Sequence, residues 1–111
     1  MKHLLKLSFS ERFILMFALR KYIKSLEDST TRKGYAPFAK MAASKIIKGA
    51  PILVDGGEMI TFVEALRNRA DYFYQNNRLF DSEFCLSLAK YIDLERKFYQ
   101  YTNGPVNKKS S

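Results

Sequence analysis

The residue types that most often perform catalysis are few in this chain and stand far apart. The one histidine is His3, near the start of the sequence, and the one cysteine is Cys85. A histidine base needs a nucleophile or a carboxylate within hydrogen-bond reach, and no helical spacing brings one to His3. Cys85 stands at the edge of an apolar helical face, so we expect a packed and inert thiol. Neither residue predicts an active site.

The acidic residues are dispersed in the same way. They follow neither the spacing of a calcium loop nor that of a two-metal cluster. The sequence Asp55-Gly56-Gly57 lacks the Lys-Ser or Lys-Thr that completes a phosphate-cradling loop. A single cysteine provides no thiolate cluster for zinc or iron–sulfur and no intrachain disulfide. We therefore expect a protein that is not an enzyme, binds no metal and uses no cofactor.

The strongest functional signal is the interval between Asp28 and Asp55, which contains no acidic residue. Residues 1–54 carry 11 Lys or Arg against 3 acidic residues, a net charge of +8, whereas residues 55–111 carry 8 of each and are neutral. A positive field on one part of a molecule favours an acidic partner, such as a phosphate backbone, an anionic membrane or an acidic protein face.

A helix expected over residues 37–48 carries most of this charge. On a helical wheel its lysines spread over one side and small residues, mainly alanine, occupy the other. A phenylalanine and a methionine fall among the lysines, and two basic loop residues precede the helix, so a partner would meet charge and apolar surface together. The alternative is that the lysines form only a solvated face. The predicted binding residues are Arg32, Lys33, Phe38, Lys40, Met41, Lys45 and Lys48.

Two kinds of partner fit this surface. The first is an acidic face of a larger protein, on which the chain would act as an accessory or inhibitory factor of the kind often carried by phages and mobile elements. The alternative is DNA or RNA bound without sequence preference, with Lys21 and Lys24 as further phosphate contacts, because no base-reading motif follows Lys48. We do not expect binding to a membrane surface, since the alanines would bury little in lipid.

The sequence contains no recognisable export signal or membrane span. The longest apolar run, from Phe13 to Leu19, has seven residues, whereas a bilayer-spanning helix needs about 20. The N-terminal residues lack the apolar core and the cleavage site of a signal peptide. Because the single cysteine also suits a reducing compartment, we expect a soluble, cytoplasmic protein.

Four helices are expected to position these residues, over about 9–27, 37–48, 57–76 and 82–102. Ser8 with Glu11 has the spacing of a capping box at the start of the first helix. The stripe expected to face the core of this helix consists of Phe9, Phe13, Met16, Phe17 and Ile23, widened by Leu15, Leu19 and Leu26. The fourth helix is expected to pack through Phe84, Leu88, Tyr91, Ile92, Phe98 and Tyr99.

An internal ion pair is also predicted. Arg20 falls within the apolar stripe of the first helix, and Glu95 falls within that of the fourth. Two buried lone charges would each cost several kcal/mol, so we expect the two helices to pack together and the charges to pair. The alternative is that the long arginine side chain reaches water.

Residues 50–57 are ambiguous. Ile52-Leu53-Val54 before Asp55-Gly56-Gly57 could be half of a hairpin completed by residues 58–61. Asp55 with Glu58 could equally be a capping box, and the helical spacing of apolar residues through 58–61 favours this second interpretation. The expected fold class is all-α, a compact four-helix domain over residues 1–105, with a hairpin or irregular excursion at 50–57 as the open alternative and a frayed tail over 106–111.

Overall fold

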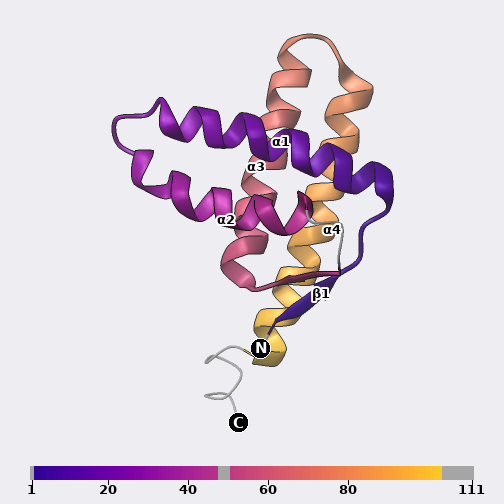
Figure 1. The fold of residues 1–111 in the computed structure, drawn as a ribbon. Helices are drawn as coiled ribbons and strands as arrows, with labels where there is room; N and C mark the ends of the chain where they lie inside the picture. The colour runs from indigo at the N-terminus through magenta and orange to yellow at the C-terminus, as the bar shows by residue number, and fades with distance from the viewer. Residues whose placement is uncertain (1, 48–50, 104–111) are drawn as a thin grey trace.

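The computed structural model describes residues 2–47 and 51–103, which form four α-helices and one small sheet (Figure 1). The helices are α1 (Phe9–Glu27), α2 (Ala36–Ile47), α3 (Gly56–Gln75) and α4 (Leu79–Asn103). A short 3₁₀ helix, η1 (Lys33–Tyr35), leads into α2, and the strands are β1 (His3–Leu5) and β2 (Ile52–Val54). The predicted all-α, four-helix fold is confirmed. Within the described residues, no helix has the length and apolar content that crossing a bilayer requires.

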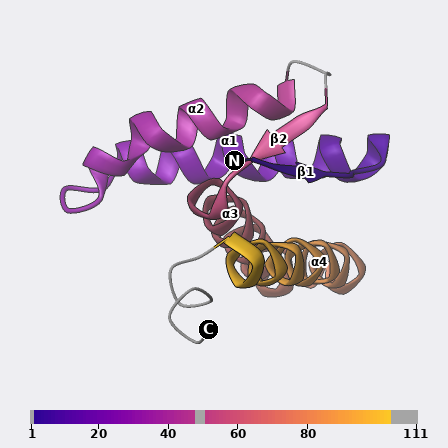
Figure 2. The same cartoon turned by 90° about the horizontal axis from the view of Figure 1, so that it is seen from below.

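The helices form two layers that cross at a steep angle. In Figure 2, α3 and α4 are seen nearly end-on, whereas α1 and α2 lie across them. Helix α1 contacts both α2 and α3, and α3 packs most extensively on α4. The core lies where the layers meet, and each helix contributes fully buried side chains, among them Leu19, Ala42, Phe62 and Ile92.

Two capping boxes fix the starts of α1 and α3. The Ser8 hydroxyl accepts a hydrogen bond from the Glu11 amide at 3.2 Å, and the Glu11 carboxylate accepts one from the Ser8 amide at 2.8 Å. Asp55 and Glu58 exchange the same pair of bonds, at 2.8 and 2.9 Å. Each box satisfies amides that the helix itself leaves without acceptors, so both sequence predictions are confirmed.

The turn between α3 and α4 is tighter than the sequence indicated. Asn77 has a φ of 61°, the left-handed conformation that often follows a helix end. The Arg78 guanidinium donates to Asp81 at 2.8 Å, and the Ser82 hydroxyl donates to the Ala70 carbonyl at 2.8 Å. Because these bonds order the turn, α4 begins at Leu79, three residues earlier than predicted.

The segment before α3 is a strand, but it does not pair as the hairpin alternative required. β2 runs antiparallel to β1, with Leu4 opposite Leu53 and Leu5 opposite Ile52. Residues 58–61 belong to α3, so the helical interpretation is confirmed and the hairpin is wrong. Local propensity could not identify β1 as the partner, because the two strands are far apart in sequence.

The predicted core face of α1 is correct only in part: Leu15, Leu19 and Leu26 are buried and Met16 and Ile23 pack against the core, but the phenylalanines do not. The buried residues of this helix are Leu15, Ala18, Leu19, Tyr22 and Leu26. The phenylalanines that were expected in the core lie outside: Phe9 is 85% exposed, Phe13 55% and Phe17 42%. Both stripes are apolar with helical spacing, and the leucine stripe packs against α2 and α3. The phenylalanine stripe is left facing solvent.

The predicted pair of Arg20 and Glu95 is not formed, for the same reason. Arg20 lies on the outer stripe of α1 and is exposed. The Glu95 carboxylate is 2.8 Å from His3 Nε2, so the N-terminal strand supplies its partner. On α4 the buried residues include Cys85, Leu88 and Ile92, whereas Phe98, predicted for the core, is exposed.

Candidate functional site

Lys45, one of the predicted binding residues, makes its polar contacts within the protein. Its ammonium group lies 2.7 Å from one oxygen of the Glu58 carboxylate and donates to the Leu53 carbonyl at 3.0 Å. The Glu58 side chain is only 6% exposed. Because a charge with little access to water is stabilised by such a partner, Lys45 joins α2 to the start of α3.

Two more predicted cations have acidic partners from other elements. The Lys40 ammonium lies 2.6 Å from the carboxylate of Glu27, and this hydrogen bond holds the pKa of Glu27 below its ordinary value. The Arg32 guanidinium donates to the Tyr22 hydroxyl at 2.9 Å and lies 3.8 Å from Glu64. The fold therefore brings acids from α1 and α3 to a segment that contains none.

The remaining predicted residues do not assemble into one cationic surface. Lys33 is exposed on η1, and Met41 is exposed on α2. Phe38 lies against the start of α3, where a Cβ built on Gly57 would be 3.4 Å from its ring. It lines a groove with Ile60, among other residues. Lys48 lies outside the described residues.

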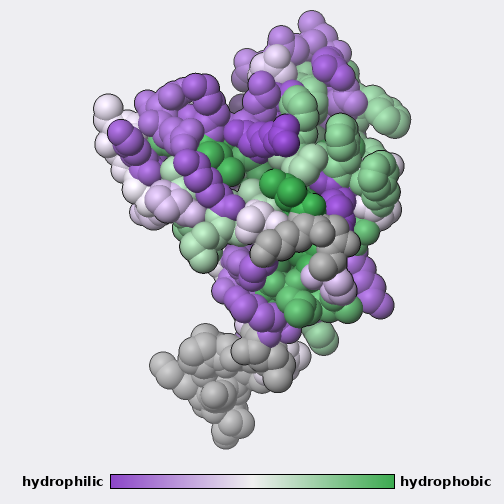
Figure 3. Space-filling model, viewed as in Figure 1, coloured by the Kyte–Doolittle hydropathy of each residue, from purple (hydrophilic) through white to green (hydrophobic). Residues whose placement is uncertain are grey.

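A different surface combines aromatic groups with cations, and we call it the outer face of α1. It consists of Phe9, Phe13, Phe17, Arg20 and Lys21. The phenylalanines occupy the first half of the helix and the cations follow. Within the described residues no carboxylate pairs with Arg20 or Lys21, whose ammonium group lies 5.7 Å from the centre of the Phe17 ring. Figure 3 shows hydrophobic side chains over the N-terminal half of α1 and the adjoining end of α2, and hydrophilic ones over its C-terminal half.

An apolar groove continues the outer face of α1 toward α2. It encloses about 420 Å³ and is lined by Phe9, Arg12, Phe13, Met16, Ile46 and Ile47. The Arg12 guanidinium donates to the Ile46 carbonyl at 3.1 Å, which fixes one wall of the groove. Ile47 is exposed, so apolar surface extends across both helices.

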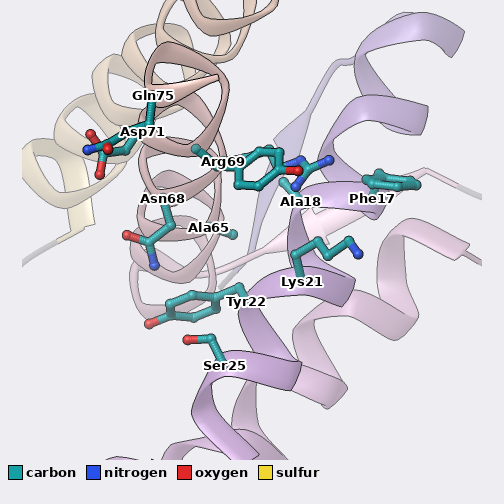
Figure 4. Close-up of a pocket in the computed structure, with 11 residues that line it drawn as sticks. Phe17, Ala18, Lys21, Tyr22, Ser25, Ala65, Asn68, Arg69, Asp71 and Gln75 are labelled. Carbon is teal, nitrogen blue, oxygen red and sulfur yellow. The ribbon is translucent and has the colours of Figure 1, made fainter. Parts of the chain in front are cut away.

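On its other side, the outer face of α1 borders a cleft of about 640 Å³ against α3. Figure 4 shows Arg69 reaching from α3 toward α1, where Phe17 and Lys21 lie. The Arg69 guanidinium is 5.0 Å from the centre of the Phe17 ring and 4.5 Å from that of Tyr72. Asp71, the carboxylate among the lining residues, is on the side of α3 turned away from α1. The cleft is therefore cationic and aromatic.

Burial raises the pKa of two groups in this region, Tyr22 in the lining of the cleft and Cys85 on α4. Burial raises the pKa of the Tyr22 hydroxyl, and the nearby Glu64 carboxylate adds to this effect. Burial also raises the pKa of the Cys85 thiol, although the positive charge of Arg69 opposes it. Among the described residues, no group of three or more histidine, cysteine or carboxylate side chains could hold a metal ion.

Sequence reasoning missed the role of the outer face of α1 because it assigned these phenylalanines to the core. One signal was present: Arg20 lies in the middle of that stripe, and a charge in an apolar stripe is typical of a face that reaches water. Arg69 carried no comparable signal, since its proximity to Phe17 depends on how α3 packs against α1.

Fold and site together define an all-α domain in which three exposed phenylalanines precede two cations on one helix. Searches against protein-family models, curated proteins and solved structures each found no match. The functional conclusion therefore rests on the residues of this chain.

Proposed function

We propose that this protein is a small, non-catalytic binding protein that docks on an acidic surface of a larger cytoplasmic protein, as an accessory or inhibitory factor. The contact surface is the outer face of α1, and not the lysine side of α2 that the sequence indicated. One observation carries the proposal: Phe9, Phe13 and Phe17 are exposed on α1, immediately before Arg20 and Lys21.

The exposed phenylalanines supply the affinity in this proposal. Fully burying one such side chain is worth roughly 1.5–3 kcal/mol, so covering two or three of them provides a hydrophobic centre for an interface. Contiguous apolar surface rimmed by polar groups is typical of protein-binding sites. The apolar groove toward α2 enlarges the area that a partner can cover.

The cations supply the preference for an acidic partner. Arg20, Lys21 and Arg69 have no carboxylate partner within the described residues, so their fields are not cancelled by a neighbouring acid. The net charge of +8 acts in the same direction over longer distances. Such a field accelerates encounter with an acidic surface, and the effect weakens as salt rises.

A second candidate function is binding to single-stranded nucleic acid in the cleft between α1 and α3. The observation that favours it is the Arg69 guanidinium beside the rings of Phe17 and Tyr72, because bases stack on aromatic side chains while cations contact phosphates. We rank it second because the outer face of α1, which borders this cleft, continues on its other side into a groove lined by aliphatic side chains such as Ile47, and these offer nothing to a base or a phosphate.

Affinity capture with matched phenylalanine variants tests the proposed function. Phe9→Ser, on the outer face of α1, should weaken binding of captured proteins by at least about tenfold, since loss of a central aromatic contact typically costs more than 1 kcal/mol. Phe80→Ser is the control, because Phe80 is 84% exposed but lies at the start of α4. Binding should be unchanged in that variant.

Nuclease treatment and vesicle flotation separate the other classes of partner. The proposal requires capture that survives nuclease and does not depend on lipid. Capture that disappears with nuclease supports the second candidate, and flotation with anionic vesicles that requires Phe9 makes the surface a membrane site. Equal losses in Phe9→Ser and Phe80→Ser would contradict a specific role for the outer face of α1.

A further inference from the structure

Arg69, on α3, is held by contacts of a different kind from those of Arg96, on α4. Its guanidinium is packed by three aromatic rings, with centres 5.0 Å away for Phe17 and 4.5 Å for both Tyr72 and Phe73. By contrast, Arg96 donates to the aspartate three residues before it at 2.9 Å. Within the described residues, no oxygen accepts a hydrogen bond from the Arg69 guanidinium.

The unused hydrogen-bond donors of Arg69 are an unusual feature of its environment. A guanidinium carries five N–H donors in its plane, and aromatic contacts to its faces satisfy none of them. Nε is buried without an acceptor, whereas the two terminal nitrogens retain contact with solvent. Leaving a buried donor unpaired is costly, so the position of this side chain is maintained by its packing and not by hydrogen bonds.

The surroundings of Arg69 suit a bound anion. The cleft encloses about 640 Å³, and Lys21 places a second positive charge on its α1 side. Ser25 and Asn68 add a hydroxyl and an amide to the lining (Figure 4). Since Asp71 turns away from α1, no carboxylate of the described lining residues occupies the space between Arg69 and Lys21.

We infer that the cleft between α1 and α3 is a receptor for a carboxylate side chain of the partner protein, bound by the terminal nitrogens of Arg69 with Lys21 beside them. This inference rests on the proposed function. It specifies the partner further: an acidic segment with apolar side chains next to the acid, which cover Phe17 and the rest of the outer face of α1.

A carboxylate of a protein fits this surface better than a phosphate of a nucleic acid. The planar fork of an arginine matches a carboxylate in two parallel hydrogen bonds, and it is already held in place by the rings. A nucleic-acid chain needs cations along its whole path. Here the cations are confined to one end of the outer face of α1, and Phe9 and Phe13 occupy the other end.

A pair of matched peptides tests the carboxylate site on the full-length protein. The first is a capped peptide with Glu and Leu on one helical face, and in the second Gln replaces each Glu. The measurement is the Arg69 Nε–Hε signal in proton–nitrogen NMR spectra. The Glu peptide should shift this signal in a saturable way, and the Gln peptide should not. Because this measurement uses the unsubstituted protein, its outcome does not depend on whether a variant folds.

Variants then assign the effect to the guanidinium. Arg69→Gln should weaken binding of the Glu peptide by at least about tenfold. Arg69→Lys keeps the charge and loses the fork, so it should weaken binding nearly as much. Arg67→Gln is the control, because Arg67 is exposed two residues away on another side of α3. It should change affinity by no more than about twofold, the scale of an exposed peripheral charge.

Several results would overturn the inference. One is an Arg69 signal that stays unmoved by saturating Glu peptide. Another is a stronger shift with oligothymidylate or inorganic phosphate at the same concentration, which would make the cleft a phosphate site. If Phe13→Ser abolishes partner capture while Arg69→Gln leaves it unchanged, the carboxylate site fails and the proposed function stands. If neither variant affects capture, both fail.

Discussion

The Glu58 side chain makes several structural contacts at once. Its carboxylate accepts the Asp55 amide in the capping box of α3 and also binds Lys45 at 2.7 Å, with Lys2 a further 3.6 Å contact. The Asp55 carboxylate nearby is partly buried, which alone would raise its pKa, but the Glu58 amide and Lys2 together lower that pKa below its ordinary value. The charges around β2 therefore stabilise the joint between α2 and α3.

We predict that Lys45→Met destabilises the protein more than Lys40→Met does. Removing Lys45 leaves the nearly buried Glu58 carboxylate without its closest cation, a change that typically costs about 1–3 kcal/mol. Lys40 and Glu27 form an exposed pair, which water and salt screen. Urea denaturation of both variants measures the two losses in the free energy of unfolding. Equal losses would show that Lys45 is no more than a surface lysine.

The residue-level predictions that succeeded depend on near neighbours in sequence. The two capping boxes need only a Ser or Asp followed by Glu three residues later, and both formed. The Arg20 and Glu95 pair required knowledge of which helix faces meet, and it failed. Helical spacing brings no carboxylate to His3, yet the fold places Glu95 within hydrogen-bond distance of it.

At the level of elements, α1 is a helix with two apolar stripes and only one core to bury them in. The buried stripe combines leucines with Ala18, the buried residues of α2 are mostly alanines, and Ala65 of α3 lies near Ala18 in the lining of the cleft. Small residues let helix axes approach closely, and this favours the leucine stripe over the bulky phenylalanines. The sequence pattern gave the extent of the helix but could not choose the buried face, which depends on the partner helices.

A comparison of Leu19→Ala with Phe13→Ala tests the orientation of α1. Leu19 is fully buried, so its truncation should lower the free energy of unfolding by about 2–5 kcal/mol. Phe13 is more than half exposed, and its truncation should change stability by less than about 1 kcal/mol, as surface substitutions do. Thermal and urea denaturation give both values. A larger loss for Phe13→Ala would mean that α1 packs through its phenylalanines.

The short sheet is the element that sequence reasoning could not locate. Each strand has three residues, and neither is long enough to show a clear alternation. Leu5 is nevertheless buried, since β1 closes one end of the core beside β2. Its pairing is determined by the tertiary fold, because isolated strands of this length have no independent stability.

At the level of the whole molecule, the fold redistributes charge that is polarised along the chain. The first half carries the excess of Lys and Arg, but Glu58 and Glu64 from the second half pair with Lys45 and Arg32. The lysine side of α2 is thus partly neutralised. Within the described residues, Arg20, Lys21 and Arg69 have no acidic partner and lie on or beside the outer face of α1, next to exposed phenylalanines, and this combination underlies the proposed function.

Photo-cross-linking from two phenylalanine positions tests the central claim most directly. Benzoylphenylalanine replaces Phe13, on the outer face of α1, or Phe80, which is exposed at the start of α4. Both changes are conservative, so the two proteins differ mainly in where the probe lies. We predict irradiation-dependent cross-links to a discrete protein from position 13 and none from position 80, with the yield falling as salt increases. Cross-links from position 80 alone, or equal yields from both positions, would contradict the assignment of the outer face of α1 as the binding surface.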